Sequence, residues 1–140
     1  MKKTYETNSE IERLVSDFET CRTGKDDFHH AQHLVVAMVY LESLSLEEAV
    51  KKLRESLLTF LDHHSIDKQK YNETLTVFWL EMVALELRRL PGNSALVDKC
   101  NSVIEVLSDP KLASEYYSDE VLWSDEARKT FVSPDLKQWK

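Results

Sequence analysis

The sequence predicts an all-α protein, built as an up-and-down antiparallel bundle of four to five main helices with short C-terminal helices wrapped across it. The 140 residues include only two glycines and three prolines, too few for the corners of a strand-rich protein. Apolar residues recur at helical spacing along five segments, and polar capping residues precede several of them. We expect one domain over residues 1–140, with the main helices in 8–108 and short helices plus a strap in 109–140.

The first two predicted helices cover residues 8–22 and 26–43. The first has Asn8 or Ser9 as its cap, and its single apolar face is formed by Ile11, Leu14, Val15, Phe18 and Cys21. In the second, Asp26 and Asp27 are expected to cap the helix and to complement its dipole. Its middle is apolar nearly all round, which predicts a central position in the bundle.

Three further helices are predicted over residues 45–64, 68–90 and 93–107. Ser45 and Glu48 have the spacing of a capping box at the start of the first of these. Pro91 and Gly92 terminate the second, and Asn93 or Ser94 starts the third. The short links between the helices imply antiparallel neighbours.

Beyond residue 108 the apolar pattern breaks into short pieces. Asp109, Ser118 and Ser124 are expected to cap short helices there. We expect large apolar side chains to fix this segment over the bundle, namely Trp123, Phe131, Leu136 and Trp139.

Composition excludes several classes of function. Lys plus Arg is 18 and Asp plus Glu is 25, a net charge of −7 with no basic block, so nucleic acid would be repelled. The longest uncharged apolar run, residues 34–41, falls far short of the roughly 20 residues that span a bilayer. The N-terminus has no apolar leader segment, and the two cysteines lack metal-binding or redox spacing. We therefore expect a soluble cytoplasmic protein.

Three histidines stand directly before the most apolar segment, in DDFHHAQHLVVAMVYL (26–41). At about 100° per residue, His30 and His33 share the side of the helix that carries Leu34 and Ala37, so both should point inward. His29 and His63 lie on polar flanks and are expected to face solvent. The inward pair has HxxH spacing.

Alternating helix directions would bring distant polar residues to one end of the bundle. Polar groups buried without partners cost about 1–3 kcal/mol each, so these residues need one another, water or a ligand. The predicted ligand-binding set comprises His30, His33, His64, Tyr71, Asn72, Thr76 and Trp79.

Two interpretations of the histidines remain open. One is a divalent transition metal held by His30, His33 and His64, since neutral imidazole binds such ions. HxxH alone is a weak signal, Glu73 is expected on the exposed side of its helix, and the ExxH pairs of di-iron bundles are absent. The other is a set of hydrogen-bonded core residues with no function of their own. Glu86, also predicted to be inward, is expected to have a structural role with Arg88 or Arg89.

The segments FHHAQHL (28–34), YNETLTVFW (71–79), YYS (116–118) and LWSDEARKTFVSPDL (122–136) resemble a group of small bacterial helical proteins with no assigned activity. Phe28, His30 and His33 match the FxHxxHL pattern of that group. Asn72 departs from its YHxTxT pattern, which carries histidine at this place. The resemblance implies a helical fold but no reaction, and the departure at Asn72 weakens the metal hypothesis.

Two functions follow as expectations. The first is a pocket for a small molecule or metal at the histidine end, with catalysis left open. The second is a non-catalytic interaction module that forms a homodimer or binds another protein. It would use an apolar surface on the outer side of the second helix, formed by Phe28, Val35 and Val39.

Overall fold

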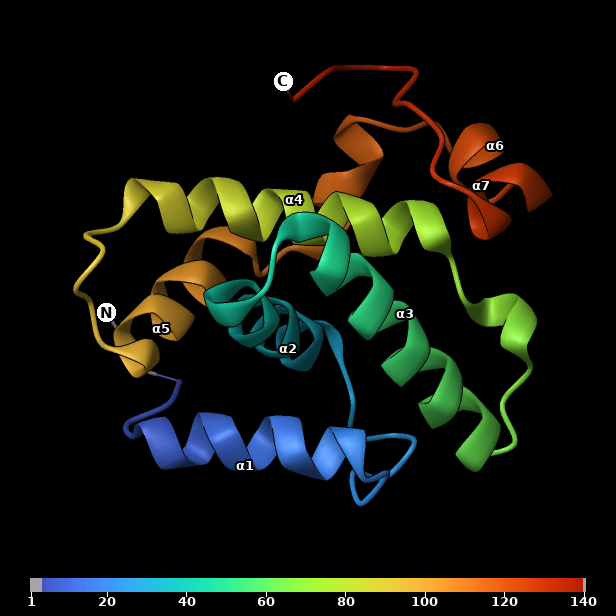
Figure 1. Ribbon diagram of the computed structural model, residues 1–140. Helices are drawn as coiled ribbons and strands as arrows, with labels where there is room; N and C mark the ends of the chain where they lie inside the picture. Colours follow the sequence, from blue (N-terminus) through green and yellow to red (C-terminus); the bar gives the residue numbers. More distant parts are fainter. Residues whose placement is uncertain (1–3, 140) are drawn as a thin grey trace.

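The computed structural model describes residues 4–139, which form five main helices packed against one another and short C-terminal helices, with no strand in this range (Figure 1). The main helices are α1 Asn8–Glu19, α2 His30–Ser43, α3 Leu46–His63, α4 Glu73–Arg89 and α5 Leu96–Leu107. The short elements are the 3-10 helices η1 Lys68–Lys70 and η2 Pro110–Glu115, and the α-helices α6 Asp119–Leu122 and α7 Asp125–Lys129. The predicted all-α class is confirmed.

Helix α2 occupies the centre of the fold, as its apolar composition predicts. It packs against each of the four other main helices. Six consecutive or near-consecutive side chains are buried along it, which are Leu34, Val35, Val36, Ala37, Met38 and Tyr40. Figure 1 shows α2 nearly along its axis, while α1 and α4 lie across the view on either side of it. The first turn of α2 therefore lies where α3, α4 and α5 can all contact it.

The second helix starts at His30, four residues later than predicted. Its N-cap is His29, whose backbone amide donates to the side chain of Gln32 over 2.8 Å. Asp26 and Asp27 belong to the preceding turn and do not cap the helix. The turn is followed by Phe28, which belongs to no regular element and whose ring stacks on Phe18 of α1 at a centroid distance of 4.2 Å. Phe28 therefore packs against α1 before α2 begins.

The predicted helix over residues 68–90 is divided in two. After η1 the backbone is extended at Tyr71 and Asn72, and α4 begins at Glu73. The side chain of Asn72 accepts the Leu75 amide over 3.0 Å, so Asn72 is a helix cap and not an interior helical residue. A cap of this kind stops a helix from extending backwards, which explains the break.

The C-terminal segment carries the three predicted caps: the side chains of Asp109, Ser118 and Ser124 each accept a backbone amide of the element that follows. The prediction for its large apolar side chains is wrong for all but Trp139. Exposed fractions are 54% for Trp123, 39% for Phe131 and 57% for Leu136. The buried contacts come mainly from the smaller side chains of Ala113, Leu122 and Ala127 and from Tyr117.

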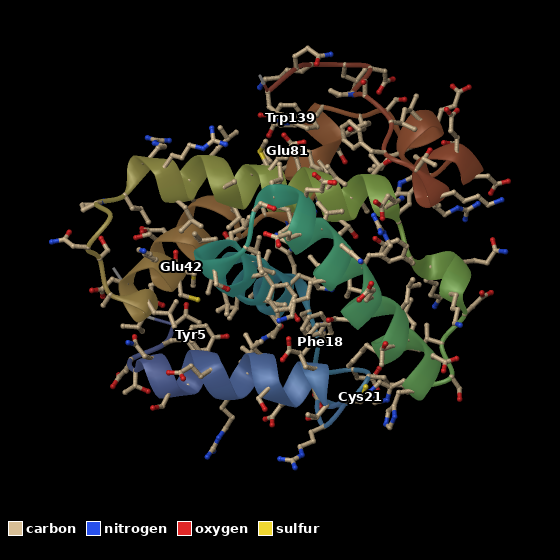
Figure 2. The ribbon with its side chains drawn as sticks, viewed as in Figure 1. Tyr5, Phe18, Cys21, Glu42, Glu81 and Trp139 are labelled. Carbon is tan, nitrogen blue, oxygen red and sulfur yellow. The ribbon has the colours of Figure 1, made fainter. Side chains whose placement is uncertain are left out.

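Trp139 closes the fold on the far side of α4 from α1. Its ring lies edge-on to Phe78 at 5.1 Å, and its indole N–H donates to Glu81 over 3.5 Å. Figure 2 shows Trp139 above Glu81, with the C-terminal strap running back over α4. Within residues 4–139, none of the helices combines the length and the apolar character that a membrane crossing requires.

Candidate functional site

A cavity of about 660 Å³ lies beside the first turn of α2. Its walls come from the turn before α2, from α2 itself, from the second half of α3 and from residues 66–79. The apolar part includes Phe28, Leu57, Phe60 and Leu75. The charged side chains on it, Lys25, Asp26 and Lys70, are all exposed.

Six of the seven side chains expected at a ligand site line this cavity, namely His30, His33, Tyr71, Asn72, Thr76 and Trp79. His64 is not among the lining residues. Its ring nitrogen Nε2 lies 3.0 Å from the carbonyl oxygen of Thr23, which can only accept, so Nε2 donates this hydrogen bond. The ring also packs edge-on against Phe60 at 4.5 Å. His64 therefore ties the end of α3 to the turn after α1.

The three imidazoles expected to share a metal ion do not form a ligand set. Over residues 4–139 there is no group of three or more His, Cys, Asp or Glu side chains that could hold a metal ion. His30 and His33 remain a pair on one cavity wall, whereas His64 bonds to the backbone elsewhere.

A backbone hydrogen bond fixes the orientation of the His30 ring and, for the neutral ring, its tautomer. Its Nε2 lies 2.9 Å from the carbonyl oxygen of Leu107 in α5, so Nε2 carries the hydrogen. Its ring stands edge-on to Trp79 at a centroid distance of 4.4 Å. In the neutral ring the lone pair therefore resides on Nδ1.

His33 is the most unusual polar side chain of the cavity. Burial, together with the nearby His30, lowers its pKa from 6.5 to about 4, so the ring is neutral at pH 7. Its ring contacts Phe28 at a centroid distance of 4.4 Å. Within the described chain no protein group forms a hydrogen bond with its ring nitrogens.

The ring nitrogens of His33 face the cavity. Across residues 4–139, no solvent-inaccessible side-chain nitrogen or oxygen lacks a hydrogen-bond partner. The unpartnered nitrogens of His33 must therefore be accessible, and the side chain does retain partial exposure. Since protein surrounds this residue closely enough to lower its pKa, the accessible surface belongs to the cavity that it lines.

Tyr71 is fixed by a charged network behind the cavity wall. Its hydroxyl donates to Glu73 over 2.6 Å, and Arg54 donates to both carboxylate oxygens of Glu73 over 2.9 and 2.7 Å. Burial would raise the pKa of Glu73, but the hydrogen bonds from Arg54 and Tyr71 outweigh it, and the pKa is lowered. Glu73 is thus buried and paired, contrary to the expectation that it faces solvent.

The side chains of Asn72 and Thr76 line the cavity and also form hydrogen bonds with backbone groups. The amide of Asn72 donates to the Leu122 carbonyl over 2.9 Å, in addition to its capping bond. The Thr76 hydroxyl donates to the Asn72 carbonyl over 3.1 Å. Glu86, predicted to have a structural role, is buried, and its carboxylate oxygen Oε2 lies 3.8 Å from the guanidinium nitrogen Nη1 of Arg89.

The sequence interpretation missed the apolar walls of the cavity. Leu53, Leu57 and Leu61 recur every fourth residue on α3, and Phe28 and Leu75 face them from other elements. Spacing of this kind predicts only a core-facing stripe. It does not show that part of the stripe lines a cavity.

Replacing Arg54 with methionine is expected to lower the free energy of unfolding by about 1–2 kcal/mol, because the largely buried Glu73 carboxylate loses its cation and two hydrogen bonds. The estimate is kept low because the Arg54 side chain is 40% exposed. Urea unfolding at pH 7 measures the change, and Lys51→Met, an exposed position on the same helix, is the control. An equal effect of the two substitutions would show that the network does not stabilise the fold.

A second cavity, of about 600 Å³, shares Tyr71 with the first and is also lined by Arg54, Leu58 and residues of α7. Its cations are partly neutralised by Glu73 and by Asp125, which pairs with Arg128. The cavity at α2 differs from it because it contains His33, whose lowered pKa keeps the ring neutral at pH 7.

No family model, no curated protein and no solved structure matches this chain.

Proposed function

We propose that this protein binds a small, largely apolar organic molecule in the cavity beside α2. The observation that supports the proposal is His33, a neutral imidazole whose nitrogens have no protein partner and open into the cavity. The volume of about 660 Å³ falls within the range of ligand sites, roughly 300–1,000 Å³. Apolar walls with a few fixed polar groups are typical of such sites.

The alternative of a hydrogen-bonded core accounts for several histidine-end residues but not for His33. His30, His64, Asn72 and Thr76 all bond to backbone groups. A buried polar group that serves only packing has such a partner, because leaving it without one costs about 1–3 kcal/mol. The ring nitrogens of His33 have no such protein partner, and a molecule bound in the cavity can supply the hydrogen bond.

The surface predicted for an interaction module is not exposed. Val35 is completely buried, and the ring of Phe28 stacks on Phe18. Side chains expected on the outer side of α2 are covered because α1, α3, α4 and α5 surround this helix. The predicted outward apolar face on α2 is therefore largely covered, with Phe28 and Val39 only partly exposed, and the cavity is the better-supported site.

Binding can be tested by filling the cavity. Leu57→Trp places a large ring into it, whereas Leu58→Trp, one residue further along α3, faces the second cavity and is the matched control. Toluene, indole and para-cresol would be titrated while amide NMR shifts are followed. We expect shifts at residues 28–37 and 71–79 in the wild type and in Leu58→Trp, and their loss in Leu57→Trp.

Circular dichroism and thermal unfolding verify that both variants fold. Absence of shifts for all three compounds in the wild type, at millimolar concentration, would contradict the proposed function. Shifts that survive in a folded Leu57→Trp variant would place the binding elsewhere.

A further inference from the structure

Building on the proposed function, we infer that the ligand is a neutral aromatic alcohol, a molecule of the phenol class, whose hydroxyl group is hydrogen-bonded by His33. The inference rests on the direction of the hydrogen bonds along the polar wall of the cavity. Tyr71, Thr76 and His30 donate their hydrogens to protein groups and can only accept from a ligand, whereas His33 can both donate and accept.

Three side chains that line the cavity already donate their polar hydrogens to other protein groups. The hydroxyl of Tyr71 donates to Glu73 over 2.6 Å, and the hydroxyl of Thr76 donates to the Asn72 carbonyl over 3.1 Å. His30 donates its Nε2 hydrogen to Leu107 over 2.9 Å, which leaves Nδ1 as an acceptor. Each of these groups can offer a ligand only an oxygen or nitrogen lone pair.

His33 differs from these three side chains because neither of its ring nitrogens forms a hydrogen bond with a protein group. The neutral ring carries one N–H donor and one lone pair. A hydroxyl group has the same pair of functions, since it donates one hydrogen and accepts through its oxygen. A single hydroxyl can therefore bond with His33 by donating to its lone pair or by accepting from its N–H.

Charged ligands fit this wall poorly. A carboxylate only accepts hydrogen bonds, so it can use the single N–H of neutral His33 but not the lone pairs of His30 and Thr76, and the two lysines that line the cavity, Lys25 and Lys70, are exposed. An ammonium group would lose its hydration without gaining a counter-charge, because Glu73 is paired with Arg54 and the one lining carboxylate, Asp26, is exposed.

The rings around the cavity favour an aromatic body for the ligand. Phe28, Phe60 and Trp79 line it together with the two imidazoles and Tyr71. Phe28 contacts His33 at 4.4 Å and Phe60 at 5.4 Å, so the polar and apolar walls adjoin. A flat ring can stack or stand edge-on against these side chains while its hydroxyl reaches His33.

The inference is tested with three probes that share one ring: para-cresol, its methyl ether and para-toluate. The ether keeps the oxygen but has no hydrogen to donate, and para-toluate is an anion at pH 7. Titration by NMR should show the ether binding about five- to tenfold more weakly than para-cresol, as expected for one lost hydrogen bond. Para-toluate should be the weakest of the three.

The His33→Leu variant should bind para-cresol and the ether with equal affinity, whereas His63→Leu, at an exposed position outside the cavity, should behave as the wild type. A readout independent of any variant is the imidazole nitrogen shift of His33, which should move with para-cresol and not with the ether. Equal binding of the two probes to the wild type, or tightest binding of para-toluate, would overturn the hydroxyl inference but leave the proposed cavity function intact. Failure of all three probes to bind would instead contradict the proposed function.

Discussion

Replacing Thr74 with valine is expected to lower the free energy of unfolding by about 2–4 kcal/mol. Thr74 is completely buried in the first turn of α4, and valine has nearly the same shape. Its hydroxyl lies 2.7 Å from the Ala127 carbonyl and 3.0 Å from the Thr130 carbonyl, and it accepts the Val132 amide over 3.1 Å. The substitution removes all of these bonds and leaves the backbone groups without a partner.

Urea unfolding measures the loss, and amide hydrogen exchange locates it. Exchange should accelerate in α7 and at Val132, because Thr74 is the side chain that joins α4 to that part of the chain. Thr59→Val, at an exposed site on α3, is the control. A loss below about 0.5 kcal/mol, within the range of ordinary surface substitutions, would contradict this account of the C-terminal segment.

The sequence predicts many of the features that depend on neighbouring residues, although the cap of α1 is Thr7 and not Asn8 or Ser9, and α5 begins after Ala95 and not at Asn93 or Ser94. The capping box at Ser45 and the caps at Asp109, Ser118 and Ser124 are found as expected, because a cap needs only a polar side chain near the free amides of the first turn. The central position of α2 follows from its apolar composition. Such local signals were sufficient for the all-α class and for most helices.

Features that depend on distant contacts could not be predicted. Glu73 was expected to face solvent from its helical angle, yet it is buried because Arg54 of α3 reaches it. The bonds from Thr74 to residues around 130 join parts of the chain more than fifty positions apart, and no pattern in the sequence indicates them. Asn72 is an exception, because an asparagine followed by Glu73 is a recognisable helix start.

The candidate site was predicted in part for the same reason. Helical angle alone indicates that His30 and His33 face inward, and six of the seven expected side chains line one cavity. The angle does not tell which inward histidine has a backbone partner. The carbonyls of Leu107 and Thr23 lie far along the chain from His30 and His64, yet they accept hydrogen bonds from these two rings. His33 has no such backbone partner, and this difference cannot be read from helical angles.

Lowering the pH from 7 to about 5 is expected to cost the wild type about 2 kcal/mol more in unfolding free energy than it costs His33→Leu. The pKa of His33 is 6.5 when exposed and about 4 in the folded protein. Between these values the unfolded chain binds a proton that the folded chain does not, so stability falls as pH falls through this window. Below about pH 4 both states are protonated and the difference stops growing.

The other titratable groups around His33 also favour its neutral form over its protonated form. The titratable groups that line its cavity are Lys25, Asp26, His29, His30, Lys70 and Tyr71. The ammonium groups of Lys25 and Lys70 disfavour a proton on His33, and the single carboxylate, on Asp26, is exposed.

Denaturant unfolding at both pH values for the wild type, His33→Leu and His63→Leu isolates the contribution of His33 to the pH dependence of stability, because the other carboxylates and histidines titrate alike in all three proteins. His63→Leu should retain the pH dependence of the wild type. If His33→Leu retains it as well, the ring at position 33 is protonated in the folded protein, and a neutral acceptor facing the cavity does not exist at that pH.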